Sequence, residues 1–385
     1  DYVEGAYYGF GLSGAGNTLT ISGETVVVAG YEGGIGVITD GGHTINHDGD
    51  MTVIGTGSAS GVELRGSVVS NTGTMNIWAG DNGRAYGIKN GSGLVDITNS
   101  GTINASGGAA SYGIDANTAH SGTDTENVIT NSGVISADIG IQVTHSSYTV
   151  TINNSGTVTG STYALRSVGD TVGITVTNTG TLDGNVLFGG GDDVLTGGGL
   201  VNGTIDGGAG NDSLAGGSGN DTMTGGDGAD TFVFASGWND DVITDFNVNE
   251  DVLDLSGSGL TYADLSIDQS GADTTISDGE GNTLTLKGVT AADVVNVNFL
   301  SDDFATFFVP DTNNGESAMP TKGARPETVS DGISITTSGT VNNGTATFFL
   351  HTSASSHSAV LLSGNDLNVT YEDDVWIGGY VDKDY

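Results

Sequence analysis

Three consecutive nine-residue segments repeat one pattern, and this repeat restricts the possible folds more than any other feature of the sequence. The segments begin at Gly207, Gly216 and Gly225, and each reads Gly-Gly-x-Gly-x-Asp-x-hydrophobic-x. Glycine adopts the left-handed backbone conformations that tight turns require, and the residues after the aspartate alternate as a β-strand does. Each nonapeptide therefore predicts a six-residue turn followed by a three-residue strand.

Two less regular copies precede these three. The first begins with Phe188 in place of glycine, and the second has Asn202 where the acid belongs and contains one extra residue. The aspartates at the sixth position are Asp193, Asp212, Asp221 and Asp230, and the hydrophobic residues at the eighth are Leu195, Leu214, Met223 and Phe232. We expect the eighth residues to face a core and the carboxylates to line the turns.

This spacing indicates binding of several calcium ions. Ca²⁺ takes about six to eight oxygen ligands, including carboxylates and backbone carbonyls. If two nonapeptides form one turn of a parallel β-roll, Asp193 pairs with Asp212, Asp212 with Asp230, and Asp221 with the Asn202 turn or with acids that follow. The glycines at the second and fourth positions would turn carbonyl oxygens inward: Gly189, Gly191, Gly208, Gly210, Gly217, Gly219, Gly226 and Gly228. Metal binding should be coupled to folding.

The nonapeptide closely resembles the calcium-binding repeat of RTX proteins. Three later segments resemble the β-sandwich flank that closes the roll of secreted serralysin-type proteases: 241–246, 251–256 and 282–288. By that resemblance, Asp245 and Asp254 would add calcium ligands. The protease motif His-Glu-x-x-His is absent from the sequence. RTX-family proteins leave the cell by type I secretion, so the resemblance implies a secreted bacterial protein, extracellular or at the cell surface.

A longer repeat precedes the nonapeptides. The pattern Asn-(Ser/Thr)-Gly-(Thr/Val)-hydrophobic starts at Asn71, Asn99, Asn131, Asn154 and Asn178. Such spacing, with two or three short strands per repeat, is typical of the rungs of a parallel β-helix, in which apolar and polar side chains stack as ladders. An antiparallel β-sandwich is the alternative, but the motif returns in the same order each time. The rungs resemble those of bacterial β-helical surface proteins.

We therefore expect an all-β chain, in which a right-handed parallel β-helix continues into a calcium β-roll and a small C-terminal β domain follows. The expected segments are an N-terminal strand or cap (1–33), the β-helix (34–187), the roll (188–234), its β-sandwich flank (235–304), a linker (305–331) and the C-terminal domain (332–385).

The composition excludes several classes of function. The chain has 8 Lys and Arg against 47 Asp and Glu, a formal charge of −39, so it offers no basic surface for nucleic acid. Such a chain repels itself unless it is neutralised, and divalent cations are the natural counter-charge. The sequence has no cysteine, hence neither a disulfide nor a thiolate metal site. The sequence contains no stretch of about 18 apolar residues, so it predicts no transmembrane helix.

These features favour an extracellular structural protein that self-assembles into a filament or a surface layer. Subunits of the homopolymer would join through their ends or by addition of a terminal strand, for which the aromatic segment Asp1–Phe10 is suited.

Two other functions remain open. A calcium-dependent adhesin or polysaccharide-binding module would use an aromatic stripe to bind a cell-surface polysaccharide: Tyr86, Tyr112, Tyr148 and Tyr163. A polysaccharide lyase or epimerase is the other, because alginate epimerases combine a β-helix with RTX modules. Such a site needs clustered acids and bases, and the bases of the β-helix are few: Arg65, Arg84, Lys89 and Arg166. We therefore expect no enzyme and assign no catalytic residue.

Overall fold

The structure, a computed structural model, divides the chain into two compact units, residues 1–300 and 301–385. It describes residues 2–4, 8–14, 16–28, 33–118, 127–144, 148–169, 172–294 and 299–300 of the first unit, and in the second unit the strands between residues 334 and 382.

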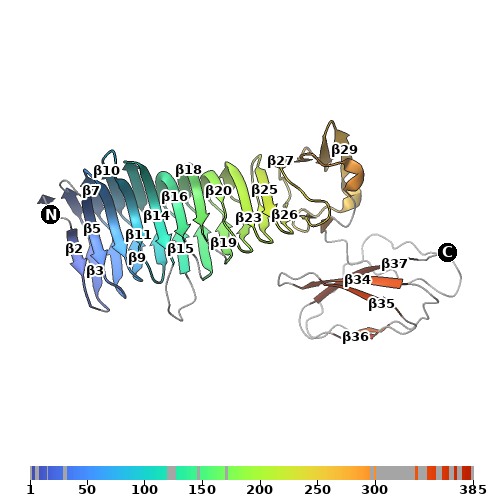
Figure 1. The fold of residues 1–385 in the computed structure, drawn as a ribbon, viewed down its shortest axis with the longest axis horizontal. Coiled ribbons are helices and arrows are strands. Elements are labelled where there is room, and N and C mark those ends of the chain that lie inside the picture. The colour runs from blue at the N-terminus through green and yellow to red at the C-terminus, as the bar shows by residue number, and fades with distance from the viewer. Residues whose placement is uncertain are drawn as a thin grey trace. The chain divides into compact units, whose positions relative to one another are not determined.

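The first unit is a parallel β-solenoid, whose successive rungs run from blue to orange in Figure 1. One of its faces is a twelve-stranded parallel sheet with one strand from each rung. In chain order these strands are β3 (Thr18–Ile21), β6 (Thr44–His47), β9 (Val68–Asn71), β12 (Asp96–Asn99), β15 (Asn127–Asn131), β17 (Val150–Asn154), β19 (Ile174–Asn178), β21 (Val194–Thr196), β24 (Ser213–Ala215), β26 (Thr231–Val233), β28 (Val252–Asp254) and β32 (Phe299–Leu300).

The remaining strands of the rungs form two further parallel rows. The first row contains β1 (Tyr2–Glu4), β4 (Glu24–Val28), β7 (Asp50–Gly55), β10 (Thr74–Ala79), β13 (Thr102–Gly107) and β22 (Leu200–Asn202). The second contains β2 (Tyr8–Leu12), β5 (Gly33–Thr39), β8 (Ser58–Leu64), β11 (Arg84–Asn90), β14 (Ala110–Asn117), β23 (Thr204–Ala209), β25 (Thr222–Asp227) and β27 (Asp240–Ile243). Three long strands span both rows: β16 (Val134–Thr144), β18 (Thr157–Val168) and β20 (Thr181–Leu187). The three-sided β-helix thus passes into a two-sided roll.

A buried asparagine ladder holds the rungs of the β-helix in register. The Nδ2 of Asn71, Asn99, Asn131 and Asn154 each donates to the Oδ1 of the next asparagine, at 2.7–2.8 Å. His47 begins the ladder through its Nδ1, 2.6 Å from Asn71 Oδ1, and Asn178 ends it by donating to the carbonyl of Leu200. Apolar ladders fill the core beside it, from Ile21 to Phe299. The expected parallel solenoid is confirmed.

The ends of the first unit differ from the simple expectation. The described part of residues 1–33 is built into the sheets as the first rungs, because β1 to β4 pair in parallel with later strands. After the roll, β27 and β28 pair in parallel with β31 (Thr283–Leu286) and β32. An antiparallel hairpin, β29 (Ser266–Ser270) with β30 (Asp273–Ser277), then joins β31, and two 3₁₀ turns accompany it, η1 (Tyr262–Asp264) and η2 (Ala291–Asp293). The segment after the roll therefore continues the solenoid and adds a hairpin to it.

The second unit contains antiparallel strands only among those described. β34 (Thr345–Thr352) lies between β35 (Ser358–Ser363) and β37 (Val375–Asp382), and β33 (Ser334–Thr336) pairs with β36 (Asn368–Thr370). These strands agree with a small C-terminal β domain, whereas the expected linker, 305–331, lies outside the described residues. Nowhere in the described part of the chain is a helix long and apolar enough to cross a membrane.

Candidate metal centre

A column of buried aspartates runs along one edge of the roll. The Asp193 carboxylate accepts a hydrogen bond from the backbone N–H of Ile174 at 2.6 Å. Each later carboxylate accepts one from the backbone N–H of the aspartate one rung before it. The distances are 2.8 Å from Asp193 N to Asp212 Oδ1, 2.9 Å from Asp212 N to Asp230 Oδ1 and 2.9 Å from Asp230 N to Asp251 Oδ1. All four residues are at most 4% exposed. The predicted pairs, Asp193 with Asp212 and Asp212 with Asp230, are confirmed.

The opposite edge has a shorter column. The backbone N–H of Asp221 donates to Asp241 Oδ1 at 2.8 Å, and both residues are buried. In the rung before, Gly203 lies opposite Asp221, since Thr204 pairs with Thr222. The expected stacking of Asp221 on Asn202 is therefore not found.

The extra residue of the second repeat explains this difference. Side chains alternate between the two faces of a strand, so a shift of one residue reverses which face a side chain points to. Asn202 is exposed in β22, where its Nδ2 donates to Asp183 Oδ1 at 3.3 Å. Of the predicted ligands, Asn202 thus lies outside the buried columns.

The glycines shape the turns as predicted. Seven of the eight at the second and fourth positions have φ between +89° and +143°: Gly191, Gly208, Gly210, Gly217, Gly219, Gly226 and Gly228. Gly189, in the least regular repeat, is not among them. A side chain other than glycine's is strained in this region.

The first glycine of each repeat has a separate function. A Cβ atom at Gly207, Gly216 or Gly225 would collide with the carboxylate of the aspartate five residues later, which is Asp212, Asp221 or Asp230. These three glycines have no positive φ. They are needed because a Cβ atom there would displace the carboxylate from the position in which it could hold a cation.

The carboxylates are poorly solvated in the folded protein. Burial raises the pKa of Asp212 and Asp221 to about 6 and the pKa of Asp230 and Asp241 to about 7. Within the described residues, no hydrogen bond reaches Oδ2 of Asp212, Oδ2 of Asp230 or either carboxylate oxygen of Asp221. Buried charge without a partner is strongly destabilising, so these oxygens require either protons or a cation.

The chemistry of these donors fits calcium. No three His, Cys, Asp or Glu side chains converge on one point in the described residues. The columns instead offer separate carboxylates beside glycine turns, so a cation would take its other ligands from backbone carbonyls. Hard oxygen donors of this kind suit Ca²⁺, whereas zinc and other softer metals prefer nitrogen and sulfur. Asp212, Asp221 and Asp230 would hold the ions, with carbonyls of the adjacent glycine turns.

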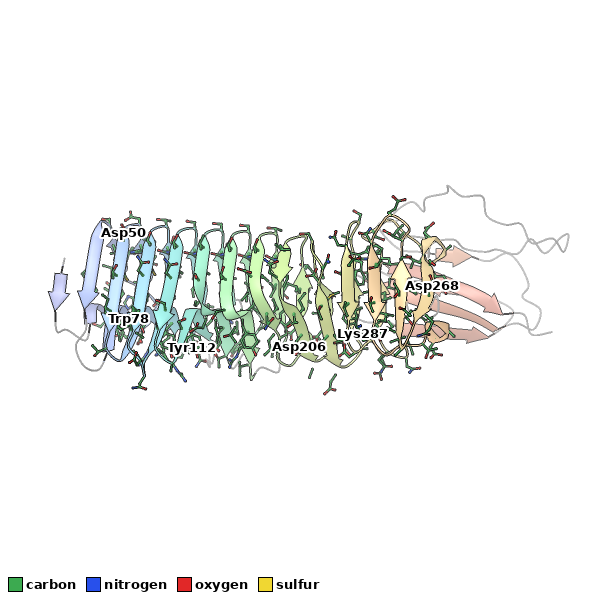
Figure 2. The ribbon with its side chains drawn as sticks, turned by 90° about the horizontal axis from the view of Figure 1, so that it is seen from above. Asp50, Trp78, Tyr112, Asp206, Asp268 and Lys287 are labelled. Atoms are coloured by element: carbon green, nitrogen blue, oxygen red, sulfur yellow. The ribbon has the colours of Figure 1, made fainter. Side chains whose placement is uncertain are left out.

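The two predicted ligands beyond the repeats lie in different environments. The carboxylate of Asp245 accepts hydrogen bonds from Gly225 N at 3.0 Å and Gly226 N at 2.9 Å, which places it on a nonapeptide turn. Burial and then the nearby charge of Asp245 raise the pKa of Asp206, labelled in Figure 2. Asp254 instead accepts bonds from the N–H and Oγ of Ser256, and its carboxylate closes a local turn.

The sequence predicted that Asp221 pairs with acids that follow, and Asp241 is that acid, but neither Asp241 nor Asp251 was named as a site residue. Both begin the pattern Asp-Val-hydrophobic, which matches the sixth to eighth positions of a nonapeptide. Of the glycines that make the repeat recognisable, only Gly237 remains before Asp241, and none remains before Asp251. An aspartate followed two residues later by a buried aliphatic residue, one rung after the last nonapeptide, was the available signal.

The fold and these buried columns define a calcium-binding β-roll at the end of a β-solenoid. Residues 198–232 match the family described as RTX calcium-binding nonapeptide repeat, in four copies. The chain therefore carries RTX calcium-binding repeats, and the expected resemblance is confirmed. Repeats of this family bind calcium and typify secreted bacterial proteins.

Solved structures with some likeness to the chain include two subunits of a mannuronan C5-epimerase from Azotobacter vinelandii. The AlgE6R3 subunit is 28% identical, over 42% of this chain and 94% of its own, with a TM-score of 0.22. The AlgE6R2 subunit is 30% identical, over 44% and 91%, with a TM-score of 0.22. The extracellular lipase LipA of Serratia marcescens is 15% identical, over 72% and 42%, with a TM-score of 0.20. Scores this low support no further conclusion, and no curated protein sequence matches the chain.

Proposed function

We propose that this chain is a non-catalytic extracellular structural protein whose solenoid is completed when calcium binds to the roll. The observation that carries the proposal is the set of buried carboxylate oxygens of Asp212, Asp221 and Asp230 that no donor in the described residues satisfies. At neutral pH these charges oppose folding of the metal-free roll. Where calcium is scarce, as inside a cell, the roll stays unfolded, and outside the cell calcium folds it.

Folding of the roll would also order the β-helix. In a solenoid each rung is stabilised mainly by its neighbours. The last rungs of the β-helix pair directly with the roll, through β19 with β21 and β20 with β22 and β23. The asparagine ladder likewise ends on the carbonyl of Leu200. A folded, calcium-bound roll would thus provide hydrogen-bonding partners for β19 and β20, the last strands of the β-helix.

Replacing single aspartates tests this role of calcium. Asp212→Ala and Asp221→Ala should each abolish calcium-dependent folding of the roll, measured by circular dichroism during a calcium titration. Asp227→Ala is the matched control, because Asp227 lies in the same repeats but is exposed. Retained folding of both core variants at the calcium concentration that folds the unaltered protein would contradict the proposal.

We extend the proposal to assembly into a filament or surface layer. A charge of −39 keeps subunits apart, and bound calcium lowers that repulsion. Among the described strands of the second unit, β35 and β37 each pair with β34 along one edge only, and such edges accept strands from other chains. Joining through subunit ends or through an added strand is therefore part of the proposal.

Electron microscopy separates assembly from calcium binding. Filaments or sheets in millimolar calcium that disperse after chelation are the expected result. Monodisperse particles in both conditions would contradict assembly while leaving calcium-coupled folding in place.

A further inference from the structure

One outer face of the β-helix holds most of the described positive side chains of a strongly acidic chain, beside the carboxylates Glu63 and Asp115. Five Lys and Arg residues have described side chains: Arg65, Arg84, Lys89, Arg166 and Lys287. Three of them, Arg84, Lys89 and Arg166, lie in the row of strands β8, β11, β14, β16 and β18. Such clustering is unexpected for a chain with 47 acidic residues.

Two side-chain columns cross this face from rung to rung. The first column is Glu63, Lys89, Asp115, Gln142 and Arg166. The second is Ser60, Tyr86, Tyr112, Ile139 and Tyr163. Lys89 Nζ lies 4.9 Å from the centre of the Tyr86 ring, and Arg166 Cζ lies 5.6 Å from that of Tyr163. The tyrosine rings thus help to position the charged ends of Lys89 and Arg166.

The tyrosines themselves are not free to bind sugar. Tyr86 and Tyr112 stack on each other, with ring centres 5.0 Å apart and planes 11° from parallel, and they are 7% and 8% exposed. Ile139 interrupts the column, and Tyr148 is not part of it. The aromatic residues expected to form a sugar-binding stripe instead pack against each other and against the side chains of Lys89 and Arg166.

Two arginines on this face have no carboxylate partner. Lys89 forms an ion pair with Glu63 at 3.4 Å, and Asp115 accepts a hydrogen bond from Gln142 Nε2 at 3.1 Å. In the part of the chain that the structure describes, neither Arg84 nor Arg166 forms a salt bridge with a carboxylate. Arg84 is exposed. Arg84 has a side-chain hydrogen bond to Tyr86, and the charge of Asp115 acts on both arginines. The remaining guanidinium N–H donors are available to an external anion.

An exposed indole lies at the corner next to Arg84. Trp78 is 45% exposed, and its indole Nε1 and Cδ1 lie so close to Gly107 that a side chain there would collide with them. Arg84 forms a backbone β-bridge with Gly108, so Trp78 and the backbone of Arg84 flank the same pair of glycines. Trp78 and Tyr112 lie along one long edge of the solenoid in Figure 2.

We propose that this face, with the corner it shares with β10, binds an anionic polysaccharide: Arg84 and Arg166 bind its acidic groups, and Trp78, on β10 of the adjacent row, packs against a sugar ring. The planar fork of arginine binds carboxylate and sulfate oxygens through paired hydrogen bonds. The rungs repeat every 4.7–4.9 Å or so, which suits a repeating polymer. The −39 chain repels nucleic acid more strongly than a polysaccharide whose charges lie further apart.

Titration with short oligosaccharides tests this proposal. Hexagalacturonate should bind the calcium-loaded protein, measured by isothermal titration calorimetry, and should quench part of the tryptophan fluorescence. Maltohexaose, a neutral hexamer, should bind at least about tenfold more weakly. A sulfated hexasaccharide distinguishes recognition of carboxylate from recognition of sulfate, and binding of either one agrees with the proposal.

Matched variants assign the binding to this face. Arg84→Ala and Arg166→Ala should each weaken binding about tenfold, since each removes a charge-assisted contact. Lys287→Ala, which removes one positive charge from β31's end, should leave the affinity unchanged. Trp78→Ala should remove the fluorescence response. Circular dichroism should be the same for all four, because the substituted groups are largely outside the core.

Three results would overturn the proposal. The first is unchanged affinity in both arginine variants, and the second is an equal loss of affinity in Lys287→Ala. The third is equal binding of a single-stranded DNA hexamer that depends on the same arginines, which would indicate a general polyanion site.

Discussion

The first glycine of each nonapeptide contributes something different from the other two. The second and fourth glycines permit backbone conformations that other residues rarely adopt. The first has an ordinary φ, and it is needed because a Cβ atom would occupy the space beside the carboxylate. Removing that space should affect metal binding without straining the turn.

Gly225→Ala tests this distinction. The new methyl group would contact the carboxylate of Asp230, and calcium affinity should fall at least tenfold or so, equivalent to roughly 1.4 kcal/mol. Gly198→Ala is the control, because a Cβ there meets no atom and its φ is not positive. Calcium titrations followed by circular dichroism measure both, and equal affinities would show that the carboxylate position that Gly225 permits is not needed for calcium binding.

The asparagine ladder gives a second prediction at single residues. Asn131 accepts from Asn99 and donates to Asn154 while fully buried. Asn131→Ala leaves both neighbours with unsatisfied groups, and we expect a loss of about 2–4 kcal/mol in stability to denaturant. Asn104→Ala removes an exposed Asn–Asn hydrogen bond and should change stability by less than about 0.5 kcal/mol. Similar losses for the two variants would contradict the structural importance of the buried ladder.

Among the structural elements, the roll should depend on pH in the opposite way to a protein held together by ion pairs. In the metal-free fold the pKa of four aspartates rises to about 6–7, against about 3.9 in the unfolded chain. The protonated forms therefore stabilise the fold. This contribution is full below about pH 4 and is lost as pH rises through 6 to 7.

Calcium-stripped protein should therefore melt at a higher temperature at pH 5 than at pH 8. Between these two pH values each carboxyl changes the stability by roughly 1–3 kcal/mol, so acid partly replaces calcium. With calcium bound, affinity should rise with pH because the metal competes with protons. Thermal unfolding followed by circular dichroism at the two pH values measures this. Stability of the stripped protein that is constant or rises with pH would show that these groups are not buried as described.

Much of the roll could be predicted from the sequence because two features recur together in each regular copy of the repeat, the turn aspartate and the buried hydrophobic residue. The aspartate and the hydrophobic residue keep a fixed separation in every copy, so the pairs Asp193 with Asp212 and Asp212 with Asp230 followed from counting. The strand register after an insertion could not be predicted from the sequence. One extra residue near Asn202 places Gly203, and not Asn202, opposite Asp221. Asp241 and Asp251 were missed because loss of most of the glycines hides a rung that the backbone still forms.

The β-helix was predictable for the same reason, but its surface was not. The repeated asparagines fixed the stacking, and every step of the ladder appears in the structure. Lys89, Asp115, Gln142 and Arg166 are scattered in the sequence, and only the alignment of rungs brings them into one column. The signal was present in the repeated four-residue segments Tyr86–Lys89, Tyr112–Asp115 and Tyr163–Arg166.

For the molecule as a whole, the solenoid predicts a direction in which order is lost. Rungs interact chiefly with their neighbours, so a solenoid destabilised at one place need not unfold everywhere at once. The proposed calcium ligands lie in the roll, from β21 to β28, whereas the asparagine ladder holds the rungs from β6 to β19. Removal of calcium should therefore disorder the roll first and then the rungs that pair with it.

Hydrogen exchange after chelation measures this progression. Amide protection should fall first in β21, β24 and β26, next in β19 and β20, and last in β9 and β12, where the ladder and apolar core are continuous. Asn131→Ala should extend the loss of protection further into the β-helix, since it interrupts the ladder between the roll and those early rungs. Simultaneous loss at all strands would instead mean that roll and β-helix form one cooperative unit, and calcium would then control the entire solenoid rather than one end of it.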